Sequence, residues 1–183
     1  MKNLLWQFVC GMAFTVASVS SSANIIYSVN HTIGAGSVVG SIETDGTLGA
    51  IATSNILDWS LTLTSANLVG GSPELITPGN TFVLGSALIA TASDLIFDFS
   101  AGDGSGFYMQ GASGNAWCMA TSGASCTGEP SPSDGFYYGT TNNWAELNNP
   151  QGRQVIASAV PEPASLALLG LGLVGLGFSR RKA

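Results

Sequence analysis

The chain has 183 residues and a formal net charge of −6. Between residues 24 and 160 there are ten acidic side chains, and Arg153 is the one basic residue, so this part has a formal net charge of −9. Such a surface repels nucleic acid and anionic membranes, because both bind through lysine and arginine. Neutral glycans and cations are the partners that this charge favours. The length suits one domain.

The N-terminus has the three-part pattern of a secretory signal peptide. Lys2 supplies the positive charge, residues 4–19 are mostly apolar, and residues 21–23 are small. This order is typical of a segment that directs export and is then removed. We therefore expect a signal helix over residues 1–23 and cleavage before Asn24.

Short alternating runs, separated by Gly, Ser, Asn and Asp, predict β-strands through the rest of the chain. In the clearest run, 56–64, the apolar residues at 57, 59, 61 and 63 are expected to face the core. Leu95, Phe97 and Phe99 are expected to do the same in 95–99. The other predicted strands are 25–29, 37–44, 48–52, 81–84, 87–92, 106–110, 116–121, 135–140 and 153–157.

Many short alternating strands are typical of antiparallel sheets packed face to face. We predict an all-β fold, an antiparallel β-sandwich of broadly jelly-roll type, with an N-terminal signal helix and a short C-terminal hydrophobic helix. A β-barrel is the alternative, and a β-solenoid is disfavoured because no fixed repeat is present. The expected divisions are a signal peptide at 1–23, the sandwich at 24–156, a linker at 157–163 and a hydrophobic sorting helix at 164–183.

Two cysteines, Cys118 and Cys126, remain after removal of the signal peptide. An even number of cysteines in an exported chain predicts a disulfide. A loop this short contributes about 2–3 kcal/mol to stability. A metal site is disfavoured because no further cysteine remains and the only histidine, His31, is distant in sequence.

The sequence contains no nucleophile-elbow, zincin, Walker or dinucleotide-binding pattern. His31 alone does not define a Ser-His-Asp site. Acidic residues scattered over turns do not define the carboxylate pair of a glycosidase. We therefore expect no catalytic residues and no enzyme.

Two groups of residues are candidate ligand sites. Asp98 and Asp103 flank or enter the glycine-rich stretch 101–106, whose oxygens suit Ca²⁺ as a weak candidate; no other cofactor is expected. The alternative is that aspartate before glycine simply forms a turn. Aromatic residues between 107 and 144 form the second candidate, a platform for stacking on sugar rings, unless they fill the core. Its members are Tyr108, Trp117, Tyr137, Tyr138 and Trp144.

The last segment of the chain has a proline-rich start, a short apolar run and a basic end. Pro161 and Pro163 favour an extended, exposed backbone. A helix over the uncharged residues 164–178 is about 22 Å long, against about 30 Å for a bilayer core. The basic residues that follow are expected to stay in the cytoplasm: Arg180, Arg181 and Lys182.

This tail, with Val160-Pro161-Glu162-Pro163, the Leu/Gly run and the basic end, resembles a PEP-CTERM sorting signal. The resemblance implies recognition by an exosortase-type membrane protease in the inner membrane of Gram-negative bacteria. It also implies an association with exopolysaccharide and biofilm. An ordinary C-terminal anchor is the alternative. Residues 40–49 and 56–63 are similar to a recurring ectodomain of PEP-CTERM proteins, to which we attach no activity.

The resemblance implies an exported protein, held transiently in the inner membrane through 164–178 and then released to the cell surface or the extracellular space. A structural or interaction role in the exopolysaccharide matrix follows as the first hypothesis. The alternative is a carbohydrate-binding module that uses the aromatic residues of 107–144.

Overall fold

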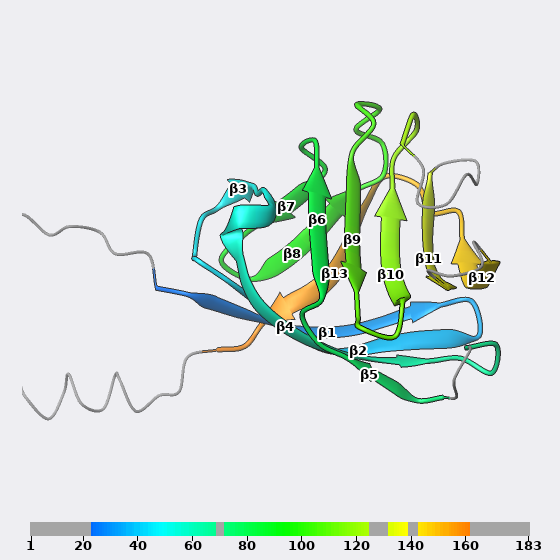
Figure 1. The fold of residues 1–183 in the computed structure, drawn as a ribbon. Helices are drawn as coiled ribbons and strands as arrows, with labels where there is room; N and C mark the ends of the chain where they lie inside the picture. Colours follow the sequence, from blue (N-terminus) through cyan, green and yellow to red (C-terminus); the bar gives the residue numbers. More distant parts are fainter. Residues whose placement is uncertain (1–22, 69–71, 125–131, 139–142, 162–183) are drawn as a thin grey trace, which may run out of the picture.

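The computed structural model describes residues 23–68, 72–124, 132–138 and 143–161 (Figure 1). The predicted signal helix and C-terminal hydrophobic helix lie outside these ranges. Within them, one 3-10 turn, η1 (Thr53–Asn55), accompanies the strands. The strands are β1 (Ile25–Ile33), β2 (Gly36–Thr44), β3 (Gly49–Ala50), β4 (Ile56–Thr64), β5 (Glu74–Ile76), β6 (Asn80–Leu84), β7 (Leu88–Ala90), β8 (Asp94–Asp98), β9 (Gly106–Gln110), β10 (Asn115–Ala120), β11 (Ser133–Tyr138), β12 (Asn143–Asn148) and β13 (Arg153–Ala159).

The strands form two antiparallel sheets. The eight-stranded sheet has the order β3-β7-β8-β13-β1-β2-β4-β5, and the five-stranded sheet has the order β12-β11-β10-β9-β6 (Figure 1). The prediction of an all-β fold with antiparallel sheets is confirmed. Its finer assignment to the jelly-roll sandwiches stays a prediction. Among the described residues, no helix is long and apolar enough to cross a membrane.

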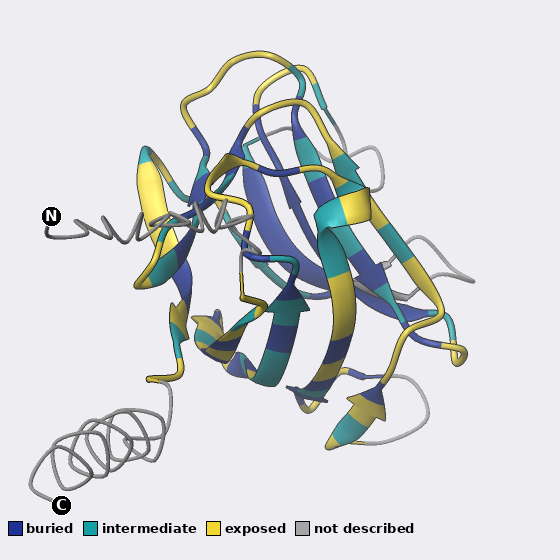
Figure 2. Ribbon diagram, turned by 90° about the vertical axis from the view of Figure 1, so that its left-hand side faces the viewer, coloured by how far each residue is buried: buried dark blue, intermediate teal, exposed yellow. Residues whose placement is uncertain are grey.

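The inward faces of the two sheets share one hydrophobic core (Figure 2). The predicted inward residues Trp59 and Phe97 are 3% and 0% exposed, and their alternating neighbours Leu61, Leu63, Leu95 and Phe99 are buried too. Burying one large apolar side chain contributes about 1.5–3 kcal/mol. Period-2 alternation therefore identified the core face of β4 and β8.

Leu57 is the exception, because it is 51% exposed although its place in the alternation predicted burial. A β-bulge is the cause. Glu43 pairs with Asp58, whereas Thr44 pairs with Ile56, so Leu57 is the extra residue of β4. The bulge turns Leu57 to solvent and lets Ile56 pack against the core.

Several predicted boundaries were wrong. β5 and β12 were missed, and the strand predicted over 48–52 is reduced to the two residues of β3. The predicted linker at 157–163 is wrong in its first part, because β13 continues to Ala159. There Ala157 and Ala159 pair with Val29 and Tyr27 of β1. The paired backbone keeps these residues in the sheet although their short side chains gave only a weak strand signal.

Candidate functional site

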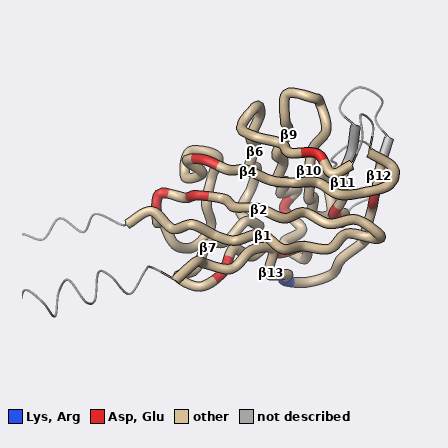
Figure 3. The backbone as a smooth tube through the Cα atoms, turned by 90° about the horizontal axis from the view of Figure 1, so that it is seen from below, with Lys and Arg blue, Asp and Glu red and all other residues tan. Residues whose placement is uncertain are grey.

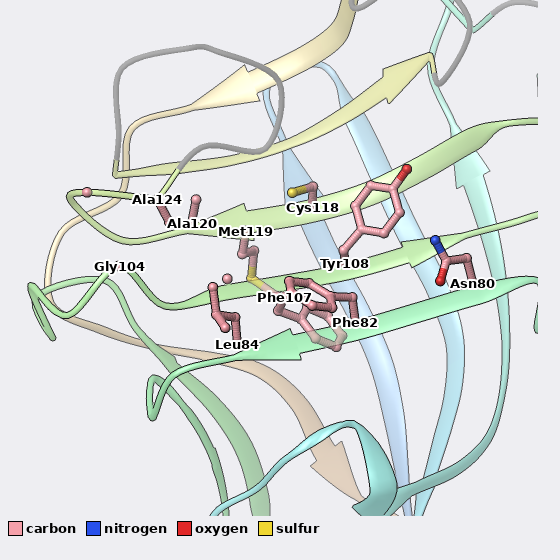
Figure 4. A pocket seen from close by; sticks show the side chains of 12 residues that line it. Asn80, Phe82, Leu84, Gly104, Phe107, Tyr108, Cys118, Met119, Ala120 and Ala124 are labelled. Atoms are coloured by element: carbon pink, nitrogen blue, oxygen red, sulfur yellow. The ribbon is translucent and has the colours of Figure 1, made fainter.

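A groove of about 420 Å³ lies over the five-stranded sheet, on the face turned away from the core (Figure 4). Alternation in β6 and β9 explains its lining. Phe82 and Leu84 are 48% and 50% exposed, and Tyr108 is half-buried, whereas Phe107 and Met109 on either side of it face the core. Asn80 adds a polar side chain at one end.

Strand register explains the shape of this groove. Phe82 of β6 lies directly opposite Tyr108 of β9, and Leu84 lies opposite Gly106. Directly opposed side chains on antiparallel strands have Cβ atoms about 4.5–5.5 Å apart, so the two aromatic rings are neighbours. Gly106 has no side chain and leaves a hollow beside Leu84. This arrangement offers flat apolar contact to a ligand, with polar groups at its edge.

Asp103 fixes the loop that forms one rim of the groove. Its Oδ2 accepts hydrogen bonds from the backbone N–H and Oγ of Ser86, at 3.2 and 2.7 Å. Its Oδ1 accepts from the backbone N–H of Ser105 at 3.0 Å and from the Ser105 hydroxyl. Hydrogen bonds from the side chains of Ser105 and then Ser86 lower the pKa of Asp103 to about 2. The carboxylate therefore joins the β6–β7 turn to the β8–β9 loop.

Asp98, the other calcium candidate, stabilises a different turn. It accepts from the backbone N–H and Oγ of Ser100 and from Nε of Arg153 at 2.9 Å. The Ser100 hydroxyl, followed by the Arg153 guanidinium, lowers its pKa. The described residues contain no group of three or more His, Cys, Asp or Glu side chains arranged to hold a metal ion. These bonds favour the turn interpretation, and calcium binding stays a prediction.

The predicted aromatic platform is only partly assembled. Tyr108 lines the groove, but Trp117 was wrongly included, because it is 0% exposed in the core. The side chains of Tyr137, Tyr138 and Trp144 lie outside what the structure describes. Sequence reasoning missed Phe82. Alternation in the predicted strand 81–84 could have indicated Phe82, because Thr81 and Val83 turn inward and Phe82 between them therefore turns outward.

A hydrogen-bonded pair of polar side chains, His31 and Asp134, lies between the two sheets. Asp134 of β11 is 2% exposed, and its Oδ2 is 2.6 Å from Nε2 of His31 in β1. Its Oδ1 accepts from Nε1 of Trp117 at 3.0 Å, and the rings of His31 and Trp117 lie 5.6 Å apart. Sequence reasoning treated His31 as an isolated polar residue, because 103 positions separate it from Asp134. Within the described ranges, no hydroxyl or thiol hydrogen-bonds to His31. The His31–Asp134 pair therefore has no nucleophile beside it in these ranges, and the contact it makes there joins the two sheets.

Cys118 lies on β10 and is 3% exposed. It is disulfide-bonded. Its predicted partner, Cys126, lies outside the described residues, so the pairing of Cys118 with Cys126 stays a prediction.

Charge is unevenly distributed over the described surface (Figure 3). Acidic side chains occur on many strands and loops, and Arg153 on β13 is the single basic one. Arg153 is already paired with Asp98. The described surface therefore offers little to phosphate-rich or other anionic partners.

The two ends of the described chain leave the domain at one place (Figure 1). β1 and β13 are antiparallel, with Tyr27 opposite Ala159. The backbone N–H of Val160 donates to the carbonyl oxygen of Ile26 at 2.8 Å. Pro161 follows, is exposed, and has no N–H with which to continue the ladder. The sheet therefore ends at the start of the proline-rich segment.

Comparison with protein families matches the PEP-CTERM protein-sorting motif to residues 159–182. The match contains the predicted Val160, Pro161, Glu162 and Pro163 and the basic residues Arg180, Arg181 and Lys182. No curated protein and no solved structure matches the chain. A PEP-CTERM sorting signal indicates export through the inner membrane to the cell surface or the extracellular space, and processing by exosortase, a membrane protease. The chain is therefore a PEP-CTERM sorting domain-containing protein.

Proposed function

We propose that this protein is a non-enzymatic structural or interaction component of the exopolysaccharide layer at the cell surface, delivered there by its sorting tail. The sorting motif at residues 159–182 is the observation that carries this proposal. Residues 164–178 hold the precursor in the inner membrane until it is cut. A disulfide between Cys118 and Cys126 then stabilises the exported domain, which carries few ion pairs.

The geometry supports an interaction role more than catalysis. The His31–Asp134 pair resembles part of a catalytic site, but Asp134 also accepts from the buried Trp117 indole. Both oxygens of the carboxylate are thereby engaged, one by His31 across the two sheets and the other by Trp117 within the five-stranded sheet. The groove over β6 and β9, in contrast, presents aromatic side chains to solvent.

Replacing Pro161, Glu162 and Pro163 with alanine tests the sorting step. We expect an uncleaved precursor that stays in the inner membrane, measured by fractionation and intact mass. The matched control replaces the exposed residues Gln151 and Gln154, just before β13 or at its start, and should be processed normally. Normal processing of the triple-alanine variant would overturn the proposal.

A carbohydrate-binding module is the second candidate function. The directly opposed Phe82 and Tyr108 on the groove favour it, because two adjacent rings can stack on successive sugar units. The acidic surface favours a neutral glycan over an anionic one. The ligand surface then includes Phe82 and Tyr108, and Trp117 is no part of it.

Affinity electrophoresis in gels that contain neutral glucans tests this candidate. We expect the Phe82→Ala/Tyr108→Ala variant to lose its retention. The control variant Leu75→Ala removes a 63% exposed leucine from β5, at the edge of the other sheet, and should be retained like the unsubstituted protein. Absence of retention for the unsubstituted protein on every glucan tested would exclude this candidate for neutral glucans.

A further inference from the structure

The sorting motif begins inside the folded domain. Its first residue, Ala159, pairs with Tyr27, and its backbone N–H donates to the carbonyl oxygen of Ser93 at 2.6 Å. The next residue, Val160, donates to Ile26. Two residues of the motif are therefore held by strands or loops on both sides of β13, and no spacer separates the domain from Pro161.

This geometry places the processing site very close to the domain. A residue spans at most about 3.3–3.6 Å of extended chain, so a bond just after Pro163 lies within about 11 Å of Val160. A domain of this length has a radius of gyration of about 14 Å. A protease that holds this segment in its active site must therefore contact the surface around the end of β13.

That surface contains a groove of about 650 Å³, which we call the exit groove. Ile26, Ala92, Ser93, Ala159 and Val160 are among the residues that line it. Ile26 and Val160 are apolar yet 47% and 50% exposed. The exit groove thus offers an exposed apolar contact at the point where the sorting segment leaves the sheet.

The charges around the exit groove favour a protein over a lipid surface. Glu43 lies beside it, opposite Ile26, and binds the side chain of Asn24 at 2.7 Å. Asp94 accepts from Ser93 at 2.7 Å and from Ser158 at 3.1 Å. The described lining contains no lysine or arginine. An anionic membrane surface is repelled by these carboxylates.

We propose that the exit groove is a docking surface for the membrane protease that cuts the sorting tail, so that the enzyme reads the folded end of β1 and β13 together with the P-E-P residues. This inference rests on the proposed processing. It adds that the sorting motif is recognised efficiently only when it is attached directly to the folded domain.

The test measures conversion of precursor to mature protein in pulse–chase experiments in the producing cell. Ile26→Asn should slow conversion at least fivefold. Val39→Asn is the matched control: Val39 is also 47% exposed and lies on the same outer face, opposite Asn30 and away from the exit groove. It should change the rate by less than a factor of two. Ala92→Gln adds bulk to the rim of the groove and should slow conversion as Ile26→Asn does. It provides an independent test if the Ile26→Asn variant folds poorly.

A twelve-residue Gly-Ser spacer between Val160 and Pro161 separates docking from motif recognition, because it spans about 20 Å. We expect the spacer to reduce the rate of the unsubstituted chain to that of Ile26→Asn or below, and to abolish the difference between the two. Full-rate processing of the spaced chain would overturn the docking proposal. So would equal rates for the Ile26, Ala92 and Val39 variants without the spacer, or an Ile26 effect that persists with it. Processing of the triple-alanine P-E-P variant would instead contradict the proposed function itself.

Discussion

The two sheets have similar inner faces and different outer faces. On the eight-stranded sheet, strand register aligns four outward serines from β13, β1, β2 and β4, namely Ser158, Ser28, Ser41 and Ser60. The neighbouring outward positions combine the polar residues Asn30, Thr32, Ser37, Thr62 and Thr64 with the exposed apolar residues Ile26 and Val39. On the five-stranded sheet, the outward positions of β6 and β9 include Phe82, Leu84 and Tyr108, which line a groove.

This difference explains why the groove with aromatic lining lies on the five-stranded sheet. Alternation sends every second residue outward on both sheets, so the identity of that residue decides the chemistry of each face. Short hydroxyl side chains form a row across the eight-stranded face, beside exposed apolar side chains such as Val39. Large aromatic side chains beside a glycine create a hollow. Four predictions, two of them with a second variant for comparison, test this contrast.

Gly40→Ala should have the largest effect, on the eight-stranded sheet. A Cβ at Gly40 would lie 2.0 Å from the carbonyl oxygen of Ser60, so β2 and β4 would have to separate. We expect a loss of about 3–4 kcal/mol in the free energy of unfolding, measured with urea. Gly49→Ala is the control, because Gly49 also has a positive φ, of +95°, but a Cβ added there would meet no atom within 4 Å. It should lose about 1–2 kcal/mol. Equal losses would show that backbone conformation, and not strand contact, determines the effect.

Asp134→Ala tests the polar link between the two sheets. It leaves the buried Trp117 N–H without its acceptor and removes the partner of His31, so we expect a loss of about 3 kcal/mol in urea unfolding. Asp134→Asn keeps an acceptor for Trp117 and should lose about 1 kcal/mol. An alanine variant as stable as the unsubstituted protein would contradict the structural role of this group.

Asp103→Asn tests how much the Asp103 carboxylate at the rim of the groove stabilises the fold, and how this contribution depends on pH. The pKa of Asp103 is about 2, below the ordinary value of about 3.9. The folded state therefore favours the carboxylate, and its contribution is present above about pH 4 and is lost as the pH falls to about 2. We expect Asp103→Asn to lose about 1 kcal/mol at pH 7, a modest value because the carboxylate is exposed. The difference from the unsubstituted protein should shrink to near zero at pH 2. A difference that does not change with pH would contradict the assigned cause.

Ser60→Ala should have the smallest effect. Ser60 is exposed on the eight-stranded outer face. Its hydroxyl makes no hydrogen bond within the part of the chain that the structure describes. We expect a change within about 0.5 kcal/mol in urea unfolding. A loss above about 1 kcal/mol would show that the serine row stabilises the sheet cooperatively, and the contrast between the two outer faces would need revision.

Local patterns predicted much of this fold because strand alternation repeats over a few residues. The inward placement of Trp59 and Phe97 followed from such patterns. Leu57 was misplaced because a bulge depends on the register with β2, which a single strand does not encode. Trp117 was misassigned for a related reason: an aromatic residue in a strand reads the same whether it faces the core or a ligand.

The sequence by itself determined the all-β class, the acidic surface and the sorting tail, because composition, alternation and a linear motif are local properties. The tertiary structure decided which distant residues meet. It brought Asp134 to His31 across 103 positions, placed Phe82 opposite Tyr108, and joined the first residues of the sorting motif to β1. Each of these contacts depends on strand order and register, which the cooperative packing of the whole chain fixes.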